Sequence, residues 1–167
     1  MDMNKKIFID ASLFLGMHKK DEAIRIACKN FFVGYFTKKL NMSLEHVGKC
    51  DDVIWKEYSP DLQDAYYPFM DRLHQNMQIK RIQYQKYDLE LALKEPLIKE
   101  FNPFHSLLLA QVINHNGVLY TLEPHLLERK DLPIKKIITS MEAKSLRETK
   151  FPKKLEARYQ TSLVLKT

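Results

Sequence analysis

The stretch that decides the fold is Lys6-Ile7-Phe8-Ile9-Asp10-Ala11-Ser12, near the start of the chain. Its apolar, β-prone run stops at Asp10, which is typical of a buried strand. The apolar residues 13–15 follow at once and predict a short helix that Gly16 closes. A buried strand that passes directly into a helix is the expected opening of an α/β fold.

Strands and helices continue to alternate along the chain. Helices are predicted over 21–32, over 51–76 with a break at Ser59-Pro60, in the first part of 88–100, over 103–115 and over 140–158. Strands are predicted over 40–44, 78–84, 118–121 and 132–138, and Ser43 is a candidate cap for the helix that follows the first of them. For the helix over 103–115, Asn102 is the expected N-cap and Gly117 the expected left-handed stop. This alternation predicts a mostly parallel α/β sheet.

The composition limits the class of protein. The chain has 167 residues, of which 45% are hydrophobic and 29% are charged, so it has the size of one domain and can bury a core. It contains no apolar run near the roughly 20 residues that a membrane-spanning helix needs, and it begins without a secretory signal pattern. Cys28 and Cys50 are too few for a disulfide framework. We therefore expect a cytoplasmic protein with no membrane partner.

The net charge of +6 is unevenly distributed. Residues 129–167 hold 11 of the 27 Lys and Arg residues and four of the 21 Asp and Glu residues, so this segment carries +7 and the rest of the chain −1. A basic arm on a near-neutral body favours binding to phosphate, although a solvated surface helix gives the same pattern. The sequence thus divides into a domain over 1–138 and a basic C-terminal extension over 139–167.

Four polar residues lie where an α/β sheet holds its ligands, beyond the carboxyl ends of the strands. Asp10 ends the first strand, Glu45 follows the second, Glu123 follows the strand over 118–121, and His105 lies in the first turn of the preceding helix. Carboxylates at one edge repel one another unless a cation lies between them, and Mg²⁺ or Mn²⁺ prefers such oxygen ligands. The pattern predicts a divalent-metal site made by Asp10, Glu45 and Glu123, although an Asp at a strand end often only caps the next helix.

Two stretches resemble those of PIN domains, a nuclease family. In PIN domains a hydrophobic strand ends in Asp, followed by a small residue and Ser or Thr, as in residues 6–12. The second stretch is His105-Ser-Leu-Leu-Leu-Ala110-Gln-Val-Ile-Asn-His-Asn-Gly117-Val-Leu-Tyr-Thr121-Leu-Glu123. It is similar to the PIN pattern of an acid opening a Leu- and Ala-rich helix, then Gly, a short strand and Thr-x-Asp. The resemblance covers roughly residues 5–138 and implies a PIN-like, Rossmann-like fold of three layers.

The resemblance also implies an activity and partners. PIN domains are Mg²⁺- or Mn²⁺-dependent endoribonucleases that act on RNA, commonly as the toxin of a toxin–antitoxin pair. An antitoxin-like protein and a second copy in a homodimer are therefore the implied protein partners. Asp10 matches the first acid, Ser12 the hydroxyl residue that supports it, and Glu123 the last acid, which is usually Asp. Glu45 is the choice for the second acid, with Asp51 and Asp52 as alternatives.

The third acid of the PIN pattern falls on His105, or on Ser106 if the register shifts by one residue. Imidazole is a ligand for Mn²⁺ or Zn²⁺ and a poor one for Mg²⁺. The site has therefore either changed its metal preference or lost catalysis, and the second case predicts a degenerate PIN-like module that binds RNA or a protein without cleaving. A third alternative is a protein-interaction subunit that uses the aromatic helix over 61–76. The remaining histidines show no zinc-type spacing and receive no role: His18, His46, His74, His115 and His125.

Overall fold

The computed structural model describes residues 5–137 and 147–166 and confirms an α/β fold with a parallel sheet. Its strands are β1 (Lys6–Ile9), β2 (Lys39–Ser43), β3 (Gln78–Ile82), β4 (Gly117–Thr121) and β5 (Ile134–Lys136), in the spatial order β3-β2-β1-β4-β5. Every neighbouring pair is parallel. The chain moves outward from β1 to β3 and then crosses to β4 on the other side of β1. The carboxyl ends of β1 and β4 therefore flank the point where the strand order reverses, which is where such sheets bind ligands.

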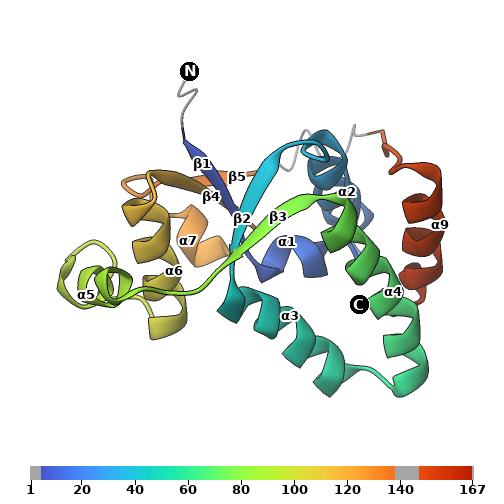
Figure 1. Ribbon diagram of the computed structural model, residues 1–167, viewed down its shortest axis with the longest axis horizontal. Helices are drawn as coiled ribbons and strands as arrows, with labels where there is room; N and C mark the ends of the chain where they lie inside the picture. Colours follow the sequence, from blue (N-terminus) through green and yellow to red (C-terminus); the bar gives the residue numbers. More distant parts are fainter. Residues whose placement is uncertain (1–4, 138–146, 167) are drawn as a thin grey trace.

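Helices cover both faces of the sheet, so the molecule has three layers (Figure 1). One side carries α1 (Ala11–Gly16), α2 (Glu22–Gly34), α3 (Leu44–Glu57), α4 (Pro60–Asn76) and α9 (Lys153–Ser162), which continues into a short 3-10 turn, η1 (Leu163–Leu165). The other side carries α5 (Lys86–Lys94), α6 (Pro103–Asn114) and α7 (Pro124–Leu127). Within β1, Ile9 packs into the first core and Phe8 into the second. Successive strand residues point to opposite faces, so the continuous apolar run of β1 is explained by burial on both sides.

The predicted strands over 40–44, 78–84 and 118–121 are confirmed by β2, β3 and β4. The predicted strand over 132–138 is shorter, because only Ile134–Lys136 pair with β4 and residue 138 lies outside the described residues. The break at Ser59-Pro60 is confirmed, since α4 has Pro60 in its first turn. α3 begins earlier than predicted, at Leu44, because Ser43 caps it through a 3.2 Å hydrogen bond from the His46 backbone N–H.

The left-handed stop after α6 is Asn116, so the assignment of this role to Gly117 was wrong. Asn116 has φ = 49° and is the one non-glycine residue with positive φ among the described residues. Its short polar side chain tolerates this conformation. Gly117 instead opens β4, where a Cβ atom would lie 2.6 Å from the ring of Phe8 on β1. Its small size therefore serves the close approach of two strands.

The helix predicted over 140–158 begins only at Lys153 in the described part of the chain. Residues 140–146 lie outside the described residues, and residues 147–152 are not helical. Pro152 stands before the first turn and disfavours helical conformation in the residue that precedes it. Phe151, Leu155 and Tyr159 are buried in the core cluster that also contains residues of α4. The described end of the chain thus packs against the body of the protein.

Two buried cations of α2 bind the acids of this C-terminal segment. Lys29 Nζ lies 2.7 Å from Glu156 and 3.0 Å from Glu148, and Arg25 lies 2.8 Å from Glu148. The charges of Glu148 and Glu156 are thereby balanced by the cations of α2. Five of its basic side chains are exposed and make no ion pair with any residue that the structure describes: Arg147, Lys150, Lys153, Lys154 and Arg158.

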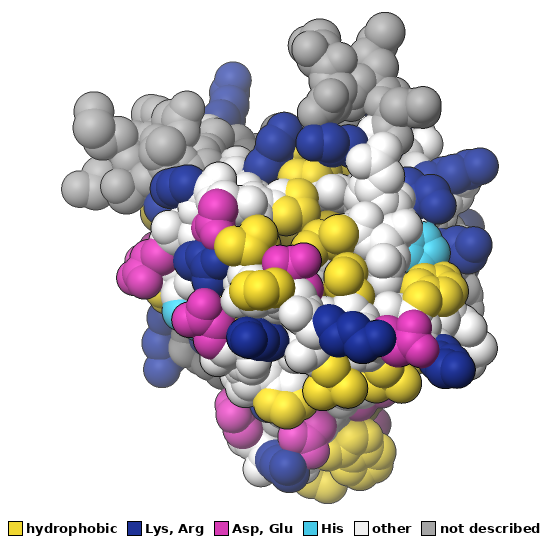
Figure 2. All heavy atoms as spheres, turned by 90° about the vertical axis from the view of Figure 1, so that its left-hand side faces the viewer, with side chains coloured by type: hydrophobic (Ala, Val, Ile, Leu, Met, Phe, Trp, Pro, Cys, Tyr) yellow, Lys and Arg dark blue, Asp and Glu magenta, His cyan; other side chains and the backbone are white. Residues whose placement is uncertain are grey.

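No helix in the described ranges is long and apolar enough to cross a membrane. The exposed large apolar side chains include Leu89 and Leu93 on α5 and Leu97 just after it. Figure 2 views the molecule from this side and shows hydrophobic side chains interspersed with charged ones. By contrast, Tyr66 and Phe69 of the aromatic helix over 61–76 are buried, so these two rings belong to the core.

Candidate metal and catalytic site

Asp10 stands at the carboxyl end of β1 and joins it to the end of β4. Its Oδ1 accepts hydrogen bonds from the backbone N–H of Ser12 (3.0 Å) and from Ser12 Oγ (2.5 Å), and its Oδ2 accepts one from Thr121 Oγ1 (2.5 Å). Ser12 Oγ in turn accepts from Leu122 N–H (2.9 Å), and Thr121 Oγ1 accepts from Glu123 N–H (3.0 Å). Asp10 is thus both the N-cap of α1 and the centre of a hydrogen-bond network at the switch point.

The Asp10 carboxyl is almost completely buried, with 1% of its surface exposed. Its pKa is raised from 3.8 to about 6: burial is the largest cause, the hydrogen bonds from Ser12 and Thr121 act in the opposite direction, and the charge of Glu123 also raises the pKa. Burial is the larger effect. The protein therefore holds a carboxylate at this edge against an energetic cost, which is characteristic of functional sites.

Next to this network, three side chains place atoms that can bind a metal ion close to one another. His105 comes from the first turn of α6, Glu123 from the residue that precedes α7, and His125 from α7 itself. One ligand atom of each lies within 4.8 Å of the others. His125 Nε2 lies 3.0 Å from His105 Nδ1, and His125 Nδ1 lies 3.9 Å from Glu123 Oε2. Burial and the charge of His125 lower the pKa of His105, so this imidazole is neutral at neutral pH. Its Nδ1 also lies 3.2 Å from Nδ2 of Asn102, so an ion at this atom would replace that contact.

A third imidazole, His46, lies against the same edge from α3. Its Nδ1 accepts a hydrogen bond from the backbone N–H of Ala11 (3.3 Å), and its ring centre lies 4.2 Å from that of Phe104. Burial and the charge of His105 lower its pKa to about 3. Its Nε2 is buried and has no hydrogen-bond partner among the described residues. A buried polar atom without a partner is rare and points to an unfilled interaction.

Residues 2–167 match a family model described as "Family of unknown function (DUF6190)". The chain belongs to the DUF6190 family. A search of curated proteins found no match. The family description names no activity, so the side chains of this DUF6190 protein must carry the functional argument.

The structure brings together three of the four predicted site residues. Asp10 and Glu123 act on each other electrostatically, and His105 lies in the group with Glu123. Glu45 is exposed in the first turn of α3. Its charge raises the pKa of Tyr84, and it is not among the described groups that shift the pKa of Asp10. Glu45 is therefore not part of the group of His105, Glu123 and His125, and its neighbour His46 is related to that group through the charge of His105.

The alternatives of the sequence analysis lie elsewhere. Asp51 faces a pocket between α3 and α4, and Asp52 forms an exposed ion pair with Lys56. Ser106 donates a hydrogen bond to the backbone of Pro103 within α6.

Sequence analysis gave no role to His46 and His125. For His46 a signal was present, because a helix capped by Ser43 places its third residue, His46, beside the cap at the strand end. For His125 the spacing Glu123-Pro-His125 was a weaker signal, since it depends on the turn that Pro124 imposes.

The donor set is rich in nitrogen. Two imidazoles and one carboxylate are the ligands of many catalytic Zn²⁺ sites, and imidazole also suits Mn²⁺. Mg²⁺ prefers oxygen ligands in a regular octahedron and fits this group poorly. The residues present therefore fit a borderline divalent ion and not Mg²⁺.

Proposed function

We propose that this protein is a divalent-metal-dependent endoribonuclease of PIN type, acting in the cytoplasm, whose ion is held mainly by imidazole nitrogens. The observation that carries the proposal is the convergence of His105, Glu123 and His125 beside Asp10 at the switch point of the sheet. The two PIN-like stretches of the sequence supply the residues of this convergence, apart from His125. RNA as substrate is inferred from that resemblance and from the exposed basic residues of the C-terminal segment.

His105, Glu123 and His125 would hold the ion. A bound divalent ion supplies Lewis-acid stabilisation of a phosphate and lowers the pKa of a water. Glu123 contributes the negative charge of the ligand group, and its side chain is 38% exposed, so a substrate has access to it.

Asp10 has a different role from these residues. Both of its oxygens are engaged by hydroxyl groups, so it fixes Ser12 and Thr121 and thereby the relative position of the ends of β1 and β4. Glu123 follows Thr121 by two residues and donates its backbone N–H to the Thr121 hydroxyl, so the network also orients the ligand-bearing turn. Asp10 is a positioning residue in this proposal.

The test is cleavage of a fluorescently labelled single-stranded RNA by chelator-treated protein, to which Mn²⁺, Zn²⁺ or Mg²⁺ is added separately. We expect cleavage with Mn²⁺ or Zn²⁺ and little with Mg²⁺. Glu123→Gln removes the charged ligand and should abolish cleavage. Glu128→Gln changes an exposed acid at the end of α7 and should leave it intact. Cleavage that survives chelation, or that Glu123→Gln does not affect, would refute the mechanism.

The degenerate PIN-like module remains the second candidate. It is favoured by the enclosure of Asp10, because a carboxylate that already accepts three hydrogen bonds is a poor ligand. RNA bound but not cut with any of the three ions, together with Mn²⁺ or Zn²⁺ binding that Glu123→Gln removes, is the outcome this alternative predicts.

A further inference from the structure

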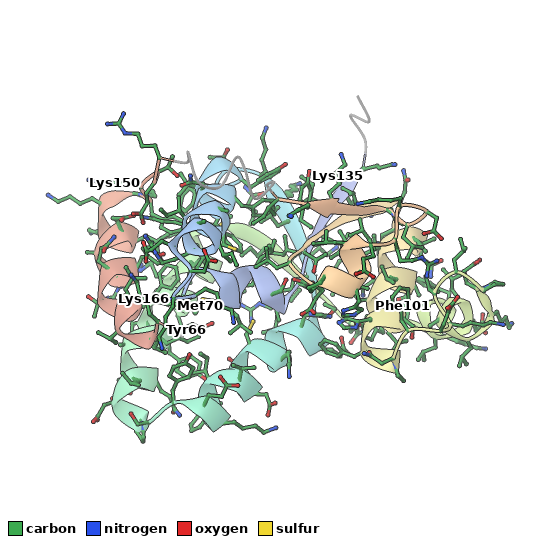
Figure 3. The ribbon with its side chains drawn as sticks, turned by 180° about the vertical axis from the view of Figure 1, so that it is seen from behind. Tyr66, Met70, Phe101, Lys135, Lys150 and Lys166 are labelled. Atoms are coloured by element: carbon green, nitrogen blue, oxygen red, sulfur yellow. The ribbon has the colours of Figure 1, made fainter. Side chains whose placement is uncertain are left out.

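A second polar site lies between α3 and α4, at the end of β2. It is a cavity of about 270 Å³ to which Asp51, Tyr66, Tyr67, Asp71, His74 and Arg81 all contribute. Figure 3 labels Tyr66 and Met70, two of the α4 residues that line it, on the opposite side of the view from Phe101, whose ring lies 6.2 Å from that of His125. The cavity is thus separate from the histidine site.

Three polar atoms at this cavity have no partner. The hydroxyl groups of Tyr66 and Tyr67 and Nδ1 of His74 are buried and make no hydrogen bond within the described part of the chain. Tyr66 has only 1% of its surface exposed, and its hydroxyl interacts electrostatically with Asp51, Tyr67 and Cys50, which also line the cavity. Tyr66 and three of the groups that act on its hydroxyl thus line the same cavity. Since buried polar groups nearly always find a partner, these atoms indicate a ligand that is recognised there.

The charge of the cavity is negative. Asp51 and Asp71 form no ion pair with any described residue, and burial, followed by the charge of Asp71, raises the pKa of Asp51. Arg81 provides one positive charge that lowers the pKa of Asp51 without pairing directly with it. Burial lowers the pKa of His74 to about 4, so this side chain is neutral at neutral pH. Two carboxylates against one guanidinium leave an unbalanced negative charge.

A single metal ion does not account for this arrangement. Among the described residues, the one group of His, Cys, Asp and Glu with donor atoms close enough for a shared ion is His105, Glu123 and His125. The carboxylates of Asp51 and Asp71 are therefore too far apart, together with His74, to hold one ion. Asp51 and Asp71 are exposed residues, and the side chains of Met42, Val47 and Met70 line the same cavity, so it offers a larger ligand both carboxylates and apolar contacts.

We propose that this cavity binds a small organic cation, namely an ammonium or amidinium group carried on an apolar body. The cationic group lies between Asp51 and Asp71 and donates hydrogen bonds to the carboxylates and to the Tyr66 hydroxyl. The apolar body packs against Met42 and Met70, and the faces of Tyr66 and Tyr67 add cation–π attraction. A free amine and a lysine side chain of another protein share this chemistry.

The test compares charged probes with neutral probes of the same shape. Benzylamine and benzamidine are titrated into the full-length protein by calorimetry, beside benzyl alcohol and benzamide. We expect the charged probe of each pair to bind at least about tenfold more tightly, and Asp51→Asn or Asp71→Asn to remove this preference. Asp52→Asn changes the neighbouring exposed acid on α3 and should have no effect.

Each remaining outcome has a defined meaning. Equal affinity of charged and neutral probes, unchanged affinity in both Asn variants, or no binding at millimolar concentration would overturn the proposal. N-acetyl-lysine methylamide is titrated as well, and tighter binding of this probe than of benzylamine identifies a protein side chain as the natural occupant. Circular dichroism and thermal unfolding of the variants verify that lost binding is not lost folding. RNA cleavage is not a readout, so the result is independent of the proposed nuclease activity.

Discussion

Replacement of Asp10 by Asn should stabilise the protein at neutral pH. Burial raises the pKa of Asp10 from 3.8 to about 6, so ionising it in the folded state costs about 3 kcal/mol relative to the unfolded chain. The folded state binds the proton more tightly than the unfolded state. The cost is therefore small near pH 4 and complete above the folded-state pKa of about 6. Asn keeps the shape, accepts from Ser12 and donates to the Thr121 hydroxyl, so it removes the charge with little other change.

The measurement is urea unfolding of wild type and Asp10→Asn in the presence of chelator, at several pH values. Between about pH 4 and about pH 7.5, the variant should gain about 2 kcal/mol of unfolding free energy relative to wild type. Taking the difference cancels the buried histidines, whose lowered pKa values destabilise both proteins in acid, as for His46 and His74. Asp21→Asn, which alters an exposed helix cap, should lack the trend. A flat difference, or a variant that is less stable at neutral pH, would refute the reasoning.

Three further predictions concern stability, each measured by urea unfolding. Lys29→Met leaves the partly buried carboxylate of Glu156 without its cation and should cost about 3 kcal/mol, whereas Lys56→Met in an exposed pair should cost less than about 0.5 kcal/mol. Equal costs would contradict the role assigned to the buried cation. Asn116→Val should cost about 1–2 kcal/mol and Asn116→Gly almost nothing, because only the backbone conformation matters there. Gly117→Ala should cost about 1–3 kcal/mol through its clash with Phe8, and a neutral effect would show that the strands separate easily.

The fold was predictable because strand and helix patterns in this chain are local and strong. The run over residues 6–9 has the β-prone composition of a strand buried on both faces, and Asn102-Pro103 marks the start of α6 with two independent signals. The left-handed position was harder to predict. Asn116 and Gly117 both tolerate it, and the choice depends on the ring of Phe8, a contact between distant parts of the chain.

The site was predictable only in part, for a geometric reason. Asp10 and Glu123 follow strand ends, and the reversal of the strand order brings neighbouring strand ends together. On the first turn of α3, adjacent residues point in directions about 100° apart, so the choice between Glu45 and His46 depends on where the helix begins. Sequence analysis named Ser43 as a candidate cap, which is confirmed, but selected the carboxylate on chemical grounds. The Ser43 cap directs His46 to the site and Glu45 to solvent.

The basic C-terminal segment, which holds the excess positive charge of the sequence, is also separated in space from the histidine site. Lys150 and Lys166 lie on the opposite side of the view in Figure 3 from Phe101, whose ring lies 6.2 Å from that of His125. A phosphate backbone that contacts Lys150 and Lys154 must therefore run along the molecule before it reaches the histidine site. Such contacts add salt-dependent affinity and carry no sequence information. If the protein cleaves RNA, reversal of these two charges should raise KM for long strands, leave kcat unchanged and spare oligonucleotides too short to reach the segment.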